Sequence, residues 1–179
     1  MSVARTAFLG AMRRVAHSVT VATTDGPAGR HGATVSSFCS VSADPPLVLV
    51  CLRAESRIAA TVRENGAFCV NVLHESAAHL AERFSARPGA PTPADRLAGV
   101  ASARGSGGAP VLANAVAAFS CRVTEVTSAG SHLVVVGEVL AVCAGEAAPL
   151  LYLDGEYATA RRRRSVLPAP GVADADHPR

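Results

Sequence analysis

The spacing of apolar residues changes near the N-terminus from a helical period to a β period. Within residues 3–16 the apolar side chains recur three and four positions apart, at Val3, Ala7, Phe8, Ala11, Met12 and Val15. This spacing predicts a helix with one apolar face. Residues 19–24 are then short and β-branched, and Asp25-Gly26-Pro27 is a turn signal, so a strand is predicted there.

Most of the other predicted elements are strands that follow one another along the chain. The predicted strands are 32–42, 47–52, 67–73, 115–127 and 132–143, with a last hairpin formed by 149–153 and 156–160. Two short helices are predicted at 57–64, with Ser56 as N-cap, and at 75–85. Residues 86–110, rich in Pro, Gly, Ala and Ser, are predicted to be a long surface loop. Strands and helices do not alternate, which favours a mainly β, antiparallel barrel with short peripheral helices.

Length and composition indicate one domain followed by a tail. The chain has 179 residues, of which 49% are apolar and 4% aromatic. This excludes a coiled coil, a collagen-like fibre and a wholly disordered chain. We expect one domain over residues 1–160 and a disordered tail over 161–179, which is rich in Arg and Pro.

Charge does not favour a nucleic-acid partner. The formal net charge is +3, and the seventeen basic residues are all Arg. Four of them form the run Arg161–Arg164, without which the balance is about neutral. The domain is therefore not predicted to bind nucleic acid, and a solvated tail explains the arginine run.

The cysteines and the longest apolar runs indicate a cytoplasmic protein. The five cysteines, Cys39, Cys51, Cys69, Cys121 and Cys143, contain no C-x-x-C pair. Their odd number and scatter fit a reducing compartment better than a disulfide framework. No apolar run approaches 18 residues, so no membrane partner is predicted.

No metal site is predicted either. His74 and His79 lie five residues apart, whereas the zinc-protease helix places its two histidines four apart so that both face one ion. Two surface histidines are the favoured interpretation.

Two segments carry candidate binding chemistry. Residues 33–42 concentrate hydroxyl side chains on a predicted strand, and one face of it would present Thr34, Ser36 and Ser40 to a polar ligand. The alternative is an edge strand with its hydroxyls in water, and composition alone leaves both open. In residues 51–57, arginines at 53 and 57 flank the Ser56 cap. A helix N-terminus with guanidinium groups favours a phosphate, although, taken in isolation, an ordinary cap beside two solvated arginines is the favoured explanation of the pattern.

Four segments together resemble a known family, the short-chain NAD(P)H:flavin oxidoreductases with the FMN-binding split-barrel fold. They are 12–15 leading into 19–21, then 32–52, 68–73 and 132–139, and the run from Thr34 to Pro46 is the most specific. The resemblance covers about residues 5–160. It implies an antiparallel Greek-key split β-barrel, NAD(P)H-dependent flavin reduction and a homodimer. It also implies that reduced flavin passes to a separate flavin-dependent monooxygenase.

The resemblance further implies a flavin site made from two segments. The residues implied to hold the isoalloxazine ring through backbone amides and hydroxyls are Thr34, Val35, Ser36 and Ser37. The residues implied to line the ribityl chain are Cys51, Leu52 and Arg53. Ser56 and Arg57 would bind the phosphate, in agreement with the interpretation from the helix N-terminus.

A nicotinamide site is implied by other matching positions. His132 is the catalytic candidate, because the family has Gly-Asp-His at the start of this strand. Here the motif is Gly130-Ser131-His132, so Ser131 replaces the acid. Phe84 and Arg87 would border the nicotinamide side. Tyr157 would pack near the cofactor or belong to the core.

The expected cofactors are FMN or FAD, with NADH or NADPH as co-substrate. A hydride transfer between two cofactors needs no dedicated acid or base, which agrees with the absence of a paired-carboxylate motif. The alternative function is a flavin-binding carrier or sensor without turnover, and Ser131 in place of the acid favours it. An oxidase of the pyridoxamine-phosphate type would need a substrate-phosphate site that the sequence does not reveal.

Overall fold

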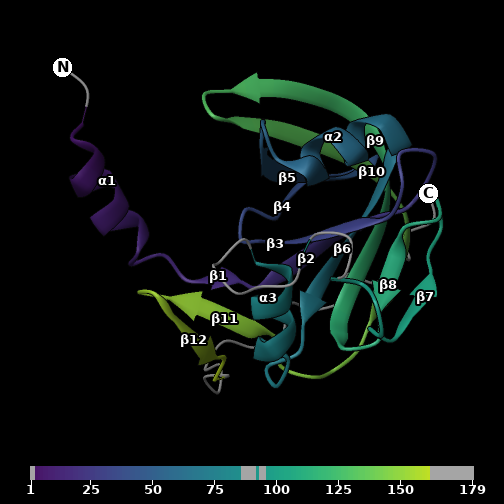
Figure 1. The fold of residues 1–179 in the computed structure, drawn as a ribbon. Coiled ribbons are helices and arrows are strands. Elements are labelled where there is room, and N and C mark those ends of the chain that lie inside the picture. Colours follow the sequence, from purple (N-terminus) through teal and green to yellow (C-terminus); the bar gives the residue numbers. More distant parts are fainter. Residues whose placement is uncertain (1–2, 86–91, 93–95, 162–179) are drawn as a thin grey trace, which may run out of the picture.

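The centre of the molecule is a seven-stranded antiparallel sheet with the strand order β3-β2-β6-β9-β10-β5-β4 (Figure 1). The computed structural model describes residues 3–85, 92 and 96–161. The seven strands are β2 (Thr20–Thr24), β3 (His31–Val35), β4 (Cys39–Ala43), β5 (Pro46–Arg53), β6 (Ala67–Leu73), β9 (Ala115–Ala129) and β10 (His132–Ala144). The mainly β, antiparallel architecture predicted from the sequence is confirmed.

Smaller elements surround this sheet. A three-stranded sheet is formed by β1 (His17–Ser18), β11 (Leu150–Leu153) and β12 (Glu156–Thr159), and a hairpin by β7 (Ser102–Arg104) and β8 (Pro110–Leu112). The helices are α1 (Arg5–Met12), α2 (Arg57–Asn65) and α3 (Ala78–Phe84). The β7–β8 hairpin corrects the prediction of a structureless loop over 86–110. Its strands are three residues long, which is too short for a period to stand out. In the part of the chain that the structure describes, no helix has the length and apolar character needed to cross a bilayer.

The single strand predicted over 32–42 is instead two strands, β3 and β4, separated by Ser36–Phe38. These consecutive strands occupy opposite edges of the seven-stranded sheet. Three residues can join the two edges only if the sheet curls back on itself. The Ser37 hydroxyl accepts from the Cys51 amide and donates to the Cys51 carbonyl, both at 2.9 Å, and these bonds continue the β4–β5 register beyond the pair Cys39–Leu49.

Helix α2 begins and ends at the residues that its sequence predicts. The Ser56 hydroxyl accepts a hydrogen bond from the Ala59 amide, and Gly66 ends the helix with a φ of 67°. Ile58, Ala59 and Val62 are buried in a core cluster that contains Phe68 and the β5 side chains Val50 and Leu52. This apolar contact places the N-terminus of α2 beside the end of β5.

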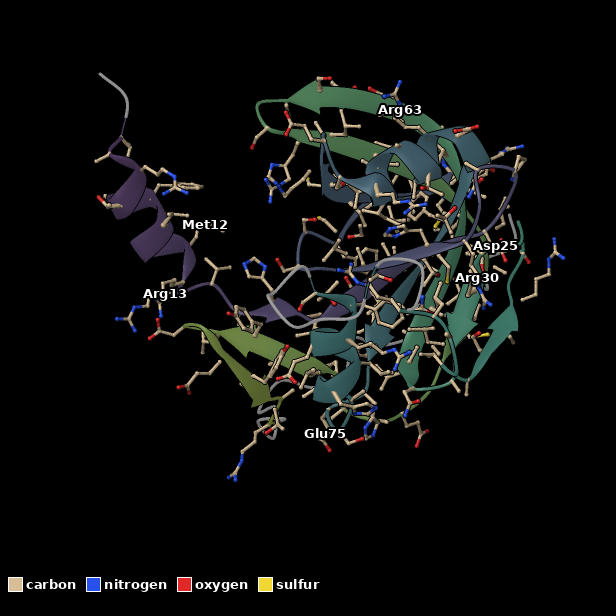
Figure 2. The ribbon with its side chains drawn as sticks, viewed as in Figure 1. Met12, Arg13, Asp25, Arg30, Arg63 and Glu75 are labelled. Carbon is tan, nitrogen blue, oxygen red and sulfur yellow. The ribbon has the colours of Figure 1, made fainter. Side chains whose placement is uncertain are left out.

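Helix α1 stands apart from the sheet (Figure 1), and none of its residues is buried. Its apolar side chains Phe8 and Met12 are 57% and 39% exposed. Figure 2 shows Arg13 beside the β11–β12 hairpin, where its Nε lies 3.1 Å from Asp154 Oδ1 and its carbonyl accepts from the Asp154 amide at 2.9 Å. The helix is therefore held at its C-terminal end while its predicted apolar face stays in solvent.

Candidate functional site

A cavity of about 750 Å³ lies between β3, the end of β5, the N-terminus of α2 and the start of β10. This volume is within the range of small-molecule and cofactor sites. Its basic lining side chains are His31, Arg53, Arg57, Arg96 and His132. No carboxylate lines it among the residues that the structure describes. The cavity therefore suits an anionic ligand.

One wall of the cavity comes from paired residues of β5 and β10. The register places Arg53 opposite His132 and Cys51 opposite Val134, and all four line the cavity. The turn before β10 is fixed by the Ala54 amide, which donates to the Ser131 carbonyl at 3.0 Å. The structure thus brings together the predicted ribityl-side and nicotinamide-side residues.

Ser131 contacts His132 directly. The Ser131 Oγ lies 3.0 Å from His132 Nδ1, and both residues lie at the turn of the β9–β10 hairpin. The tautomer of the ring decides which atom donates. A hydroxyl at this position therefore orients the imidazole, as a carboxylate would, but carries no charge.

Another part of the cavity lining is the segment 34–37. The Thr34 hydroxyl donates to the Ala81 carbonyl at 2.7 Å, and the Ser37 hydroxyl is engaged with Cys51. Both hydroxyls bond to backbone groups of the protein. They therefore fit neither the predicted ligand-facing role nor the alternative of hydroxyls in water. Ser36 is exposed and lines the cavity, whereas Ser40 is exposed on β4 and does not line it, because the break at 36–38 interrupts the alternation.

The N-terminus of α2 forms one end of the cavity, where Ser56 and Arg57 both line it. The first turn of a helix leaves amide groups without helical partners and carries a partial positive charge. The Arg57 guanidinium adds a full positive charge in the same place. This is the arrangement that binds phosphate groups in many proteins.

Two basic residues at this end were not predicted. His31 is 4% exposed, lines the cavity, and has no hydrogen-bond partner at either ring nitrogen. Burial lowers the pKa of His31 below its usual range, and the charges of Arg96 and Arg57 lower it further, outweighing the nearby Gly32 backbone. Arg96 is buried and donates to the Phe84 carbonyl at 3.3 Å. No hydrophobic periodicity distinguishes His31 or Arg96. The only signal in the sequence is that Arg30 and His31 come just before the hydroxyl-rich run at 33–42.

The remaining predicted residues lie around this cavity or outside the described part. Phe84 is fully buried and lines the cavity. Tyr157 lies instead in a smaller cavity of about 150 Å³, which shares Thr34, Val35 and Ser36 with the main one. The ring of Tyr157 packs edge-on against Tyr152, with centroids 5.8 Å apart. Arg87 lies outside the described residues.

The curled antiparallel sheet and its cationic cavity define a β-barrel protein with a cavity suited to an anionic ligand. The chain matches the family described as "Flavin reductase like domain" over residues 12–161, and it belongs to this family. The family resemblance and the split-barrel fold predicted from the sequence are therefore confirmed.

Individual relatives agree with this assignment. A protein of Variovorax paradoxus (strain S110) named FMN reductase (NADH) RutF is 45% identical over 152 residues, which cover 84% of this chain and 82% of the relative. The structure of flavin reductase PheA2 matches with a TM-score of 0.80 and 31% identity, covering 89% of this chain and 100% of PheA2. BorF, the flavin reductase component of a bacterial two-component tryptophan halogenase, gives the same four values.

Proposed function

We propose that this protein is a flavin reductase that transfers a hydride from NADH to FMN. The observation that carries the proposal is one cavity that is lined both by a phosphate-type site at the α2 N-terminus and by His132. Arg57, the α2 N-terminus and the partnerless ring of His31 fit a phosphorylated flavin better than an uncharged one. The printed name of the Variovorax relative supports FMN and NADH over FAD and NADPH.

Each segment of the wall has a role in this proposal. Backbone groups of Thr34–Ser37 would hold the isoalloxazine ring and stabilise negative charge at its polar edge. Cys51, Leu52 and Arg53 would line the ribityl chain, and Ser56 and Arg57 would bind the phosphate. The flavin accepts the hydride, while the protein supplies alignment and electrostatics. His132, oriented by Ser131, would position the nicotinamide against the flavin.

A separate flavin-dependent monooxygenase is the proposed consumer of the reduced flavin. BorF is named as the reductase component of a two-component halogenase, which supports such a partner here. The five free cysteines support a reducing, cytoplasmic location.

We expect His132→Ala to lower kcat/KM for NADH by about tenfold or more, because the lost side chain positions the nicotinamide. The assay mixes the purified protein with NADH and excess FMN and follows the absorbance of reduced nicotinamide. His79→Ala, which alters an exposed histidine that does not line the cavity, is the matched control. Tight flavin binding without oxidation of NADH or NADPH would contradict the proposal and favour the flavin-binding carrier or sensor.

A homodimer is also proposed, because among the residues that the structure describes nothing covers the apolar face of α1. A second copy would bury Phe8 and close the cavity beside Met12. Sedimentation equilibrium should give twice the 18.2 kDa of the chain, and Phe8→Asp should shift the protein towards the monomer. Thr6→Asp, about half a turn away on the same exposed helix, should not. A monomeric wild-type protein would contradict this proposal.

A further inference from the structure

His31 is a buried polar side chain whose two ring nitrogens have no protein partner. It begins β3, pairs in register with Thr24 of β2, and faces the cavity. A buried polar group without a hydrogen bond costs about 1–3 kcal/mol, so such groups in native structures call for an explanation. One explanation is a ligand that enters the cavity and supplies the missing hydrogen-bond partner.

The groups around His31 specify the sign of that ligand. Arg57 on α2 and Arg96, which follows α3, both act on the ring with positive charge. Thr24, the register partner of His31 on β2, and Phe84 of α3, which lines the same cavity, are uncharged. In the described part of the chain no acidic residue lines the cavity. An anion would be attracted to both arginines and would also favour the protonated ring.

We propose that His31 is a direct ligand of the flavin phosphate, and that it binds this group as an imidazolium after taking up a proton when the nucleotide enters. This inference rests on the proposed function, since FMN supplies the phosphate. It assigns to His31 the discrimination between FMN and riboflavin, which differ only in that group. The phosphate would lie between the α2 N-terminus, Arg57 and His31.

The sign of the pH dependence follows from the two states of the ring. In the empty cavity burial and the two arginines hold the pKa of His31 below its usual range, so the ring is neutral at pH 7. A phosphate monoester is mostly a dianion there, since its second pKa is about 6. The dianion raises the pKa of the ring, and FMN affinity then falls as the pH rises through the pKa of the complex. Riboflavin carries no phosphate and should not show this fall.

Calorimetric titration at pH 7 in phosphate-free buffers of different ionisation enthalpy measures how many protons the protein takes up when a flavin binds. The full-length protein should take up about one proton per FMN and almost none per riboflavin. A dianion that entered without a titrating protein group could only release protons. His31→Gln keeps a hydrogen-bonding side chain that cannot titrate. It should abolish the uptake and lower the ratio of FMN to riboflavin affinity by about tenfold.

His79→Gln is the matched control, because it makes the same exchange at an exposed histidine that does not line the cavity, and it should retain the proton uptake. Wild-type protein that binds FMN with no uptake would overturn the inference without any variant. So would His31→Gln that keeps both the uptake and the preference for FMN. Uptake on adding NADH alone would assign the subsite to the dinucleotide and overturn it too. If neither flavin bound, the proposed function itself would fail.

Discussion

Replacing Asn71 by leucine is expected to lower the free energy of unfolding by about 3 kcal/mol. Asn71 is fully buried in the middle of β6. Its Nδ2 donates to the Val21 carbonyl at 3.1 Å and to Thr23 Oγ1 at 3.2 Å, and its Oδ1 accepts from the Leu112 amide at 2.8 Å. Leucine keeps the branched shape and the number of heavy atoms but leaves the Leu112 amide and the β2 acceptors with one partner fewer.

Denaturant unfolding followed by circular dichroism measures this loss. Thr124→Val is the control, because the exposed Thr124 hydroxyl donates one hydrogen bond to the Val136 carbonyl at 3.3 Å on the surface of the sheet. Its removal should cost less than about 0.5 kcal/mol. A loss below about 1 kcal/mol in Asn71→Leu would show that water or a shifted β8 satisfies the buried groups.

The elements of the barrel follow from local sequence. β6 has the same bounds as the predicted strand because every residue in it is buried, so its apolar run is interrupted only by Asn71. α2 is predicted to within one residue because its cap and its αL glycine are local signals. In contrast, nothing local shows that Asn71 would meet β2 and β8, since Leu112 is 41 residues away.

The break between β3 and β4 has a long-range cause that local patterns do not contain. Residues 32–42 have strand propensity throughout, but the curl of the sheet separates them into its two edges. Part of the hydroxyl-rich composition has a structural cause, because the Ser37 hydroxyl bonds to both backbone groups of Cys51 in the register of the β4–β5 pair. A pattern first interpreted as ligand chemistry thus also contains a contact within the sheet.

The sequence predicts those lining residues of the cavity that lie close together along the chain, and it misses those that do not. Residues 34–37 and 51–57 are short segments with their own signals, and both line the cavity. His31 and Arg96 lie 65 residues apart and meet only through the packing of β3, α2 and the segment after α3. Tyr157 matched the family pattern, yet the strand pairing of β11 and β12 places it in the neighbouring small cavity.

Gly32→Ala is expected both to destabilise the fold by about 2 kcal/mol and to weaken FMN binding by about tenfold. A Cβ at this position would lie 2.7 Å from Cε1 and 2.9 Å from Cδ1 of Phe84. The Phe84 ring is fully buried and lines the cavity. It therefore has to give way towards the space that the flavin would occupy. Denaturant unfolding and quenching of flavin fluorescence measure the two effects.

A second glycine separates packing from binding. A Cβ at Gly137 in β10 would lie 2.6 Å from the Phe68 ring, which is equally buried but does not line the cavity. Gly137→Ala should therefore lose a similar free energy of unfolding and keep its FMN affinity. Adding Phe84→Leu to Gly32→Ala should restore part of the stability, because the smaller side chain makes room for the Cβ. Equal FMN affinities in the two alanine variants would show that Phe84 moves away from the cavity, and that its ring does not shape the flavin site.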